Sequence, residues 1–257
     1  MSLDYLAFLR AESARFAEVL ADVDPGAGVP SCPEWTAADL LWHLGEVQHF
    51  WGTIVRDRLT DTDSYEEPVR PDAHPALVDF FAASSTVLID ALASTGDDVG
   101  VWTWLDADHS VGFVRRRQAH EALIHRLDAE LTAGDVTELD AGLATDGVLE
   151  AIEWFFGGAP AWATTTADGP IGRLATTDTG ASWRVQVGQW SGTSPNTQRT
   201  YADEPLLLLV DAGEPSFEVS GTAGDLDAWM WNRPTQGEIR RAGDPSAFEA
   251  VIRQGVQ

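Results

Sequence analysis

The sequence predicts a two-part fold, an N-terminal four-helix bundle followed by a small α+β sheet domain. In the first half, apolar residues recur at three- and four-residue spacing over four long segments. In the second half, shorter apolar runs are separated by clusters of Gly, Pro, Asp and Thr, which is typical of strands and turns. The acidic, glycine-containing stretch 134–142 separates these patterns, so we expect domains at residues 1–140 and 145–257.

The four helices of the first half have recognisable ends. An Asp-Pro-Gly turn at 24–26 ends the first helix, and Gly134 ends the fourth. Thr36 and Asp39 have the spacing of a capping box, which starts the second helix at about residue 37. Pro75 starts the third. The expected spans are about 6–20, 37–54, 75–92 and 110–132.

The second half begins with a short helix at Gly147–Phe156 and continues with strands. Two further helices are expected near its end. The expected strands are Ala161–Thr166, Ile171–Thr177, Ser182–Val187, Leu206–Asp211 and Ser216–Ser220, and the two helices are Ala223–Trp231 and Pro245–Arg253.

Composition excludes several classes of partner. The formal charge is −25, and all 16 basic residues are arginines. So acidic a surface repels phosphate backbones and anionic lipids, which argues against nucleic-acid and membrane partners. Cys32 is the only cysteine, which excludes an intramolecular disulfide and a cysteine-based zinc site. No apolar run approaches membrane-spanning length and no signal peptide is recognisable, so we expect a cytoplasmic protein, a monomer or weak homodimer.

Three polar side chains form a candidate metal site. Glu121 and His125, in RRRQAHEALIHRLDAEL, are four residues apart and project from one face of a helix. His43, in WTAADLLWHLGEVQHFW, shares the apolar face of the second helix and is the best third ligand. Two histidines and one carboxylate leave a coordination position open, which is the mark of a catalytic metal site.

Each of these residues also has a simpler interpretation. Glu121 and His125 alone are more often an exposed helix pair, and His43 alone is more often a core histidine with one hydrogen bond. The combination favours a metal, because a buried carboxylate facing two histidines needs a compensating cation. Any one of Asp39, Glu46 and Asp128 can accept the second ring N–H of a ligating histidine.

The arginine run 115–117 has two interpretations as well. It is either a solvated helix face or, in so acidic a chain, a sign of an anionic ligand near the metal helix. The sequence has no serine-hydrolase elbow, no P-loop and no strand-linked dinucleotide-binding glycine motif. Metal chemistry is therefore the leading hypothesis.

The segments VPSCPEWTAADLLWHLGEVQHFW and AHEALIHRLDAEL resemble the mycothiol-dependent maleylpyruvate isomerase family, a branch of the DinB-like metal-binding four-helix bundles. GTAGDLDAWMWNRPTQGEIRRAGDP resembles that family's C-terminal domain, a small α+β unit similar to sterol-carrier folds. The likeness covers essentially the whole chain. It implies that His43, Glu121 and His125 bind zinc and that Arg233 takes part in catalysis. Arginines would hold carboxylates on the thiol cofactor or the substrate, and we expect Arg117 to be the cofactor-binding one.

The resemblance implies that zinc and mycothiol, a low-molecular-weight thiol, are the cofactors. Zinc lowers the pKa of a thiol bound in its open position, and the thiolate attacks a small electrophile in an isomerase or transferase reaction, of which maleylpyruvate isomerisation is one candidate. One alternative is a metal-dependent hydrolase that uses metal-bound water and needs no thiol. A second alternative is a non-enzymatic protein that binds a small molecule or lipid, whose function would survive loss of His43.

Overall fold

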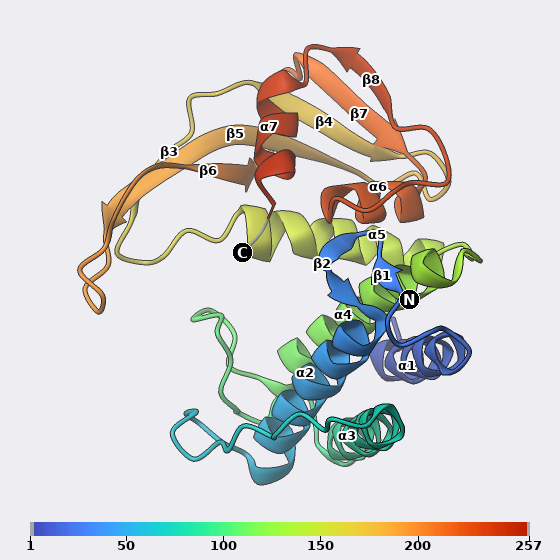
Figure 1. The fold of residues 1–257 in the computed structure, drawn as a ribbon. Coiled ribbons are helices and arrows are strands. Elements are labelled where there is room, and N and C mark those ends of the chain that lie inside the picture. Colours follow the sequence, from blue (N-terminus) through green and yellow to red (C-terminus); the bar gives the residue numbers. More distant parts are fainter. Residues whose placement is uncertain (1–2, 256–257) are drawn as a thin grey trace. The chain divides into compact units, whose positions relative to one another are not determined.

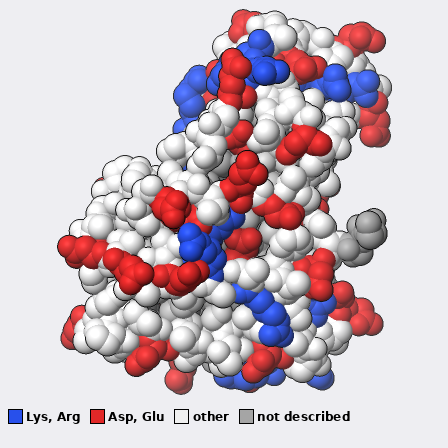
Figure 2. Space-filling model, turned by 90° about the vertical axis from the view of Figure 1, so that its right-hand side faces the viewer, with Lys and Arg blue, Asp and Glu red and all other residues white. Residues whose placement is uncertain are grey.

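The computed structural model describes residues 3–255 and divides the chain into two compact units, with the boundary between Glu138 and Leu139. The first unit is mainly helical and the second combines helices with a mixed sheet (Figure 1). The fold class predicted from the sequence is therefore confirmed. Acidic side chains are spread over much of the surface shown in Figure 2, as expected for 41 acidic against 16 basic residues.

The N-terminal unit contains four long helices and one short hairpin. Helices α2 and α3 pack closely along their length, as do α1 and α4. The hairpin directly precedes α2 and was not expected from the sequence. The elements are α1 (Tyr5–Ala21), β1 (Gly28–Val29), β2 (Cys32–Thr36), α2 (Ala37–Asp57), α3 (His74–Ser94) and α4 (Val111–Ala133).

Local signals set the ends of the helices that matter for the site. The side chain of Thr36 accepts a hydrogen bond from the backbone N–H of Asp39, and the Asp39 carboxylate accepts one from the backbone N–H of Thr36. This capping box satisfies two N–H groups that the first turn of α2 leaves without helical partners. Helix α4 ends at Gly134, which has a φ of 75°. Glycine adopts this left-handed conformation without strain.

A buried ion-pair network ties α1 to α4. Arg126 is 3 % exposed and donates to Glu12 at 2.7 Å and to Glu130 at 2.8 Å. Arg15 on α1 donates to the other oxygen of Glu130 at 2.9 Å. Because removing one partner would leave an uncompensated buried charge, this network fixes how the two helices face each other.

Helix α3 corrects one expectation from the sequence. It has 21 residues with a mean hydropathy of 1.6 over its most apolar window, which is long and apolar enough to span a membrane by length and composition alone. A core helix of a bundle passes the same test, and Leu77, Phe81 and Leu88 of α3 are buried in this unit.

The C-terminal unit is a six-stranded sheet with three helices and a π-helical turn. Strand β5 pairs with β4, β3 and β6, and all of these pairings are antiparallel. Strand β4 pairs in parallel with β7, which carries the edge strand β8. The elements are α5 (Ala141–Glu150), the π-helical turn Ala151–Phe156, β3 (Thr164–Thr166), β4 (Ile171–Thr176), β5 (Ser182–Thr193), β6 (Thr200–Leu209), β7 (Phe217–Gly221), α6 (Ala223–Met230), β8 (Arg240–Gly243) and α7 (Ser246–Gln254).

Helices and sheet share one apolar core in this unit. Val185 of β5 and Val219 of β7 face the helices, and Ile152, Leu226 and Phe248 meet them from the helical side. Each of these five side chains is less than 2 % exposed. Their burial against one another supplies the hydrophobic stabilisation of the unit.

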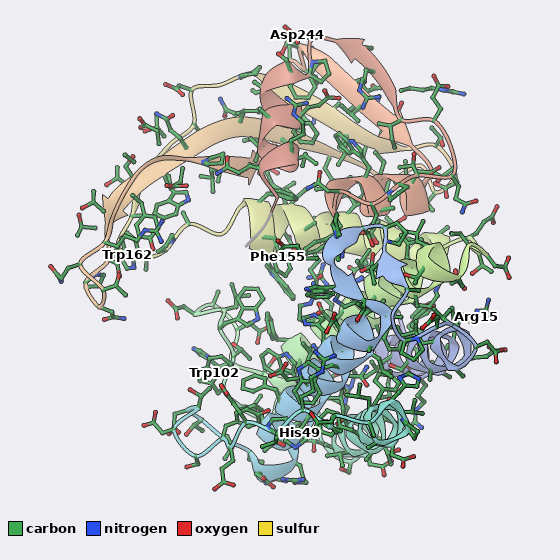
Figure 3. All side chains as sticks on the ribbon, in the orientation of Figure 1. Arg15, His49, Trp102, Phe155, Trp162 and Asp244 are labelled. Carbon is green, nitrogen blue, oxygen red and sulfur yellow. The ribbon has the colours of Figure 1, made fainter. Side chains whose placement is uncertain are left out.

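Two strand predictions were incomplete. Strand β5 extends past its predicted end and β6 begins before its predicted start, so the two form a long hairpin. The ring of Trp162, labelled in Figure 3, contacts that of Trp190 in this hairpin, and Trp190 contacts Tyr201. Strand β8 was not predicted at all. Its sequence RRAG has no apolar alternation, and it is held by backbone pairing with β7.

Candidate metal centre

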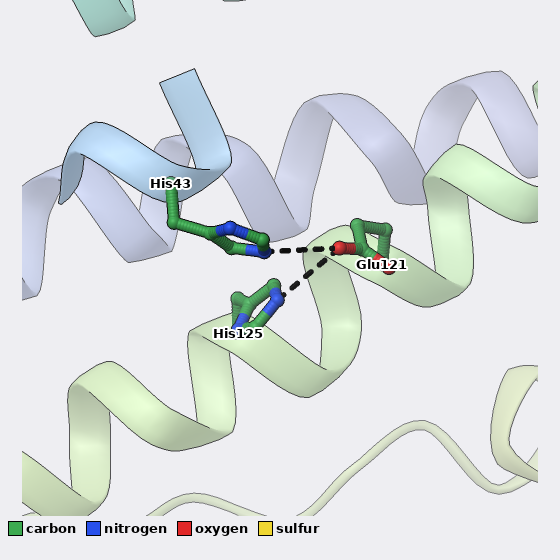
Figure 4. Close-up of side chains that lie close together, drawn as sticks. All are labelled: His43, Glu121 and His125. Atoms are coloured by element: carbon green, nitrogen blue, oxygen red, sulfur yellow. Dashed lines mark hydrogen bonds and ion pairs between the residues drawn. The ribbon is translucent and has the colours of Figure 1, made fainter. Parts of the chain in front are cut away.

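Three side chains from α2 and α4 converge on one point of the N-terminal unit. Nε2 of His43 lies 3.5 Å from Oε1 of Glu121, and Nε2 of His125 lies 3.2 Å from the same oxygen (Figure 4). The three donor atoms all lie within 4.8 Å of one another. No other such group of three His, Cys, Asp or Glu side chains occurs among residues 3–255.

The spacing of these donors fits a divalent metal. Ligands held at about 2.0–2.2 Å from a tetrahedral zinc lie roughly 3.3–3.6 Å from one another. The contacts of Glu121 with His43, at 3.5 Å, and with His125, at 3.2 Å, are close to that range. Two imidazoles and one carboxylate are also the donor types found in three-ligand zinc sites. The residues present therefore fit a zinc ion.

Buried polar partners orient two of the three side chains. Nδ1 of His125 lies 2.9 Å from Oδ2 of Asp128, whose other oxygen accepts a hydrogen bond from Ser31 at 2.5 Å. Arg117 donates to Oε2 of Glu121 at 2.9 Å, which leaves Oε1 facing the histidines. These contacts orient the ring of His125 and select Oε1 as the oxygen of Glu121 that faces the histidines, before any ion binds.

Of the three acids that the sequence left open as partners, Asp128 occupies this position. Asp39 instead caps α2 and pairs with Arg70 at 2.6 Å. Glu46 bonds neither imidazole in the part of the chain that the structure describes. Asp128 lies three residues after His125 on α4, so its carboxylate reaches the outer nitrogen of that ring.

The carboxylates and imidazoles strongly perturb each other's protonation. Burial alone would raise the pKa of Glu121, but hydrogen bonds from His125 and His43 outweigh it and hold that pKa well below its usual value. Burial would lower the pKa of His125, but the hydrogen bonds with Asp128 and Glu121 outweigh it and raise that pKa to about 9. In the metal-free protein, His125 therefore carries a proton at neutral pH.

The arginine run of α4 is largely engaged within the N-terminal unit. Arg117 is only 4 % exposed and contacts Glu121, so it lies beside the candidate centre. Arg115 donates to Asp97 and to the backbone carbonyls of Leu92 and Thr95. These contacts do not fit the interpretation of the run as a solvated helix face. Binding of the thiol cofactor by Arg117 stays a prediction.

Arg233 belongs to the C-terminal unit and directly follows Asn232, which has a left-handed φ of 58°. One of its guanidinium nitrogens donates to the backbone carbonyl of Trp231 at 2.7 Å. The side chain is half-buried. Its catalytic role likewise stays a prediction.

The remaining histidines of α2 and α4 lie outside the cluster. His49, labelled in Figure 3, contacts the hydroxyl of Tyr65 through Nδ1 at 3.1 Å. His120 is 1 % exposed and meets the ring of Tyr5.

Two neighbours of the centre were missed from the sequence. Both come from the β1–β2 hairpin: Ser31, in its turn, and Trp35, in β2. The ring centroid of Trp35 lies 4.7 Å from that of His43 and 6.3 Å from that of His125. The position of Trp35, one residue before the cap of α2, was the signal available, because a residue there lies beside the first turns of the helix.

Comparison with known proteins finds a family match within the N-terminal unit and a shared fold over most of the chain. The family described as "Mycothiol maleylpyruvate isomerase N-terminal domain" matches residues 6–130. Two crystal structures of mycothiol-dependent maleylpyruvate isomerase, one of them a histidine-to-alanine mutant, are similar over 94 % of this chain and 93 % of theirs. The mutant has a TM-score of 0.58 at 16 % identity, and the other structure has 0.57 at 15 %. No protein of curated function matches the sequence significantly.

The structural likeness establishes a shared fold, since the identities are low. The family match covers nearly all of the N-terminal unit, including the three converging side chains. Over residues 6–130, the N-terminal unit is therefore similar to the mycothiol maleylpyruvate isomerase N-terminal domain family.

Proposed function

We propose that this protein is a zinc-dependent, mycothiol-using enzyme of the isomerase or transferase type that acts on a small electrophile, with maleylpyruvate as one candidate substrate. One observation supports this most directly. His43, Glu121 and His125 converge from α2 and α4, within a domain whose family is named for a mycothiol-dependent isomerase. Three protein ligands leave a coordination position for a further group, as in catalytic zinc sites.

The chain's own residues define how such an ion is held. Nε2 of both histidines and Oε1 of Glu121 point to one place, and these are the ligand atoms. Asp128 accepts the proton of Nδ1 on His125, which selects the tautomer whose Nε2 has a free lone pair. Zinc bound here supplies a Lewis acid that lowers the pKa of a thiol and so makes the nucleophilic thiolate available at neutral pH.

The exposure of the ligands leaves room for a second molecule. The side chains of His43 and Glu121 are 31 % and 22 % exposed, whereas that of His125 is 9 % exposed. A small thiol can therefore reach the site from the side of His43 and Glu121. In an isomerisation, its sulfur adds to a conjugated cis double bond, the resulting single bond rotates, and the same sulfur leaves to regenerate the thiol.

The test combines metal analysis with calorimetry. Purified wild-type protein and Glu121→Ala are reconstituted with zinc, their metal content is measured, and mycothiol is titrated into each. We expect about one zinc per wild-type chain and heat of thiol binding, and loss of both in the variant, because one of three ligands is gone. His49→Ala is a matched control, since His49 lies on α2 but contacts Tyr65 rather than the cluster.

Two results would contradict the proposal. Wild-type protein that stays metal-free after reconstitution would reject the metal centre. Tight binding or turnover of a substrate with no thiol present would instead favour a metal-dependent hydrolase on the same ligands.

A further inference from the structure

The two histidines of the proposed centre are held in different ways. His125 is 7 % exposed and hydrogen-bonded through Nδ1 to Asp128. The side chain of His43 is 31 % exposed, and its polar contact is the 3.5 Å approach of Nε2 to Glu121. In residues 3–255, no hydrogen bond holds Nδ1 of His43. Any further restriction on the rotation of this ring therefore comes from packing against its neighbours.

The indole of Trp35 is the group in that position. Its ring lies 4.7 Å from the ring of His43 at an interplanar angle of 44°, a tilted contact within the range of favourable aromatic pairs. It also lies 6.3 Å from the ring of His125, at 32°. The ring centroids of His43 and His125 are 4.8 Å apart, and the angle between the two ring planes is 75°. Trp35 thus flanks both rings, and the closer contact is with His43.

The backbone that carries Trp35 is fixed on both sides. Strand β2 pairs with β1 through Gly28 and Thr36, and Thr36 is the cap of α2. The first residue of α2, Ala37, donates to the carbonyl of Ala27 at 2.8 Å. The indole therefore projects from a short, well-bonded segment rather than from a loose loop.

The same hairpin reaches the other histidine through its turn. Ser31 donates to Asp128, and Asp128 is the partner of His125. Asp128 is fully buried, so this contact is shielded from water. The hairpin thus contacts His43 on α2 directly and the hydrogen-bond partner of His125 on α4.

We infer that Trp35 is the positioning residue of His43, as Asp128 is that of His125, and that it raises the metal affinity of the centre by restricting this ring before the ion binds. This inference rests on the proposed metal centre. Partners that orient a ligating histidine typically change metal affinity by about 10- to 100-fold. Because a ring contact is less directional than a hydrogen bond, we expect the lower end of that range for Trp35.

The experiment measures zinc dissociation constants by competition with a chromophoric chelator, and the visible absorption of Co²⁺ bound in place of zinc. Trp35→Ala should bind zinc roughly 10-fold more weakly than wild type and give a broadened Co²⁺ spectrum. Trp35→Phe keeps a ring against His43 and should stay within about 3-fold of wild type.

Trp42→Ala is the matched control. Trp42 and Trp35 are both half-buried and pack against the same core cluster, but Trp42 stacks on Phe80, with centroids 5.0 Å apart. Its loss removes a similar ring without touching the centre and should leave zinc affinity unchanged. If Trp35→Ala does not fold, Trp35→Leu retains apolar packing without the ring and should show the same direction of change.

The outcomes separate the inference from the proposed function. Wild-type affinity in folded Trp35→Ala or Trp35→Leu would overturn the positioning role and leave the metal centre intact. An equal loss in Trp42→Ala would also overturn it, since the effect would then reflect general loosening of the unit. Folded wild-type protein that binds neither zinc nor Co²⁺ would reject the metal centre and the inference together.

Discussion

Zinc binding should be strongly pH-dependent because His125 must lose a proton to become a ligand. Hydrogen bonds with Asp128 and Glu121 raise the pKa of His125 to about 9 in the metal-free protein, against the effect of burial. A metal needs the neutral imidazole, so metal and proton compete for the same nitrogen. Because the pKa is raised, the competition is present at neutral pH and ends as pH rises through about 9.

The magnitude follows from that pKa. At pH 7, roughly 1 % of the metal-free protein has a neutral His125, so the apparent zinc affinity is on the order of 100-fold below its high-pH limit. Between about pH 6.5 and 8.5, the affinity should rise nearly tenfold per pH unit. A histidine with an ordinary pKa near 6.5 would give almost no change over the upper half of this range.

Chelator competition at a series of pH values measures this slope, and calorimetry in buffers of different ionisation heat counts the protons released. Other groups at the site can also release protons, so Asp128→Asn is the matched comparison. The amide of Asn has the shape of the Asp128 carboxylate but no charge, so the pKa of His125 should move closer to its ordinary value. The apparent zinc affinity should then depend less steeply on pH. A pH-independent affinity in the wild type from pH 7 to 8.5, with no proton released, would refute this account of His125.

Three further predictions concern stability, each measured by urea or thermal unfolding. Thr36→Ala removes the side-chain cap of α2 and should cost about 1 kcal/mol, or roughly 3–5 °C in Tm, while Thr36→Ser should be nearly neutral; equal losses in both would show that the cap is not the cause. Gly52→Ala should destabilise the N-terminal unit by about 1–3 kcal/mol, because a Cβ there would lie 3.0 Å from the backbone nitrogen of Leu88, and a neutral result would mean that α2 and α3 can separate freely. Phe248→Ala should cost about 3–5 kcal/mol in the C-terminal unit, since its ring is 0 % exposed in the core, and a loss under 1 kcal/mol would contradict that packing.

The helices of the N-terminal unit were predictable because their ends carry strong local signals. The Thr36–Asp39 pair, Pro75 and Gly134 each act within one turn of the helix that they start or end. Observed and predicted boundaries of α1 and α4 differ by only a residue or so at each end. Where short-range chemistry determines an element, the sequence alone is sufficient.

The hairpins were less predictable because long-range pairing determines them. Nothing local in RRAG favours a strand, and β8 forms only because β7 presents an unpaired edge. The β1–β2 hairpin contains Pro30 and Pro33, which are depleted in strands. The hairpin packs against α2 and α4, so its strand pairing depends on contacts with helices that local sequence does not reveal. The sequence therefore missed the element that supplies Trp35 and Ser31.

For the candidate centre, the residues were identifiable but their partners were not. Helical spacing places Glu121 and His125 on one face, and the apolar face of α2 places His43 inward. The spacing could not decide among three acids, because reaching Nδ1 of His125 depends on the side-chain rotamer and on burial. The partner of Arg117 could not be predicted from the sequence either. Its place in an arginine run suggested an anionic ligand, whereas the structure shows a contact with Glu121.

The arrangement of charge explains how the metal-free bundle tolerates its own site. Asp128 is fully buried and Glu121 is largely buried, and His125 lies between them with contacts of 2.9 and 3.2 Å. Two carboxylates so placed require a positive charge, because an uncompensated buried charge is strongly destabilising. A proton on His125 supplies part of it and Arg117 supplies more. When a divalent ion replaces that proton, a positive charge still lies between the carboxylates of the site. On this reasoning, the proton and the metal are alternative occupants of one preformed site.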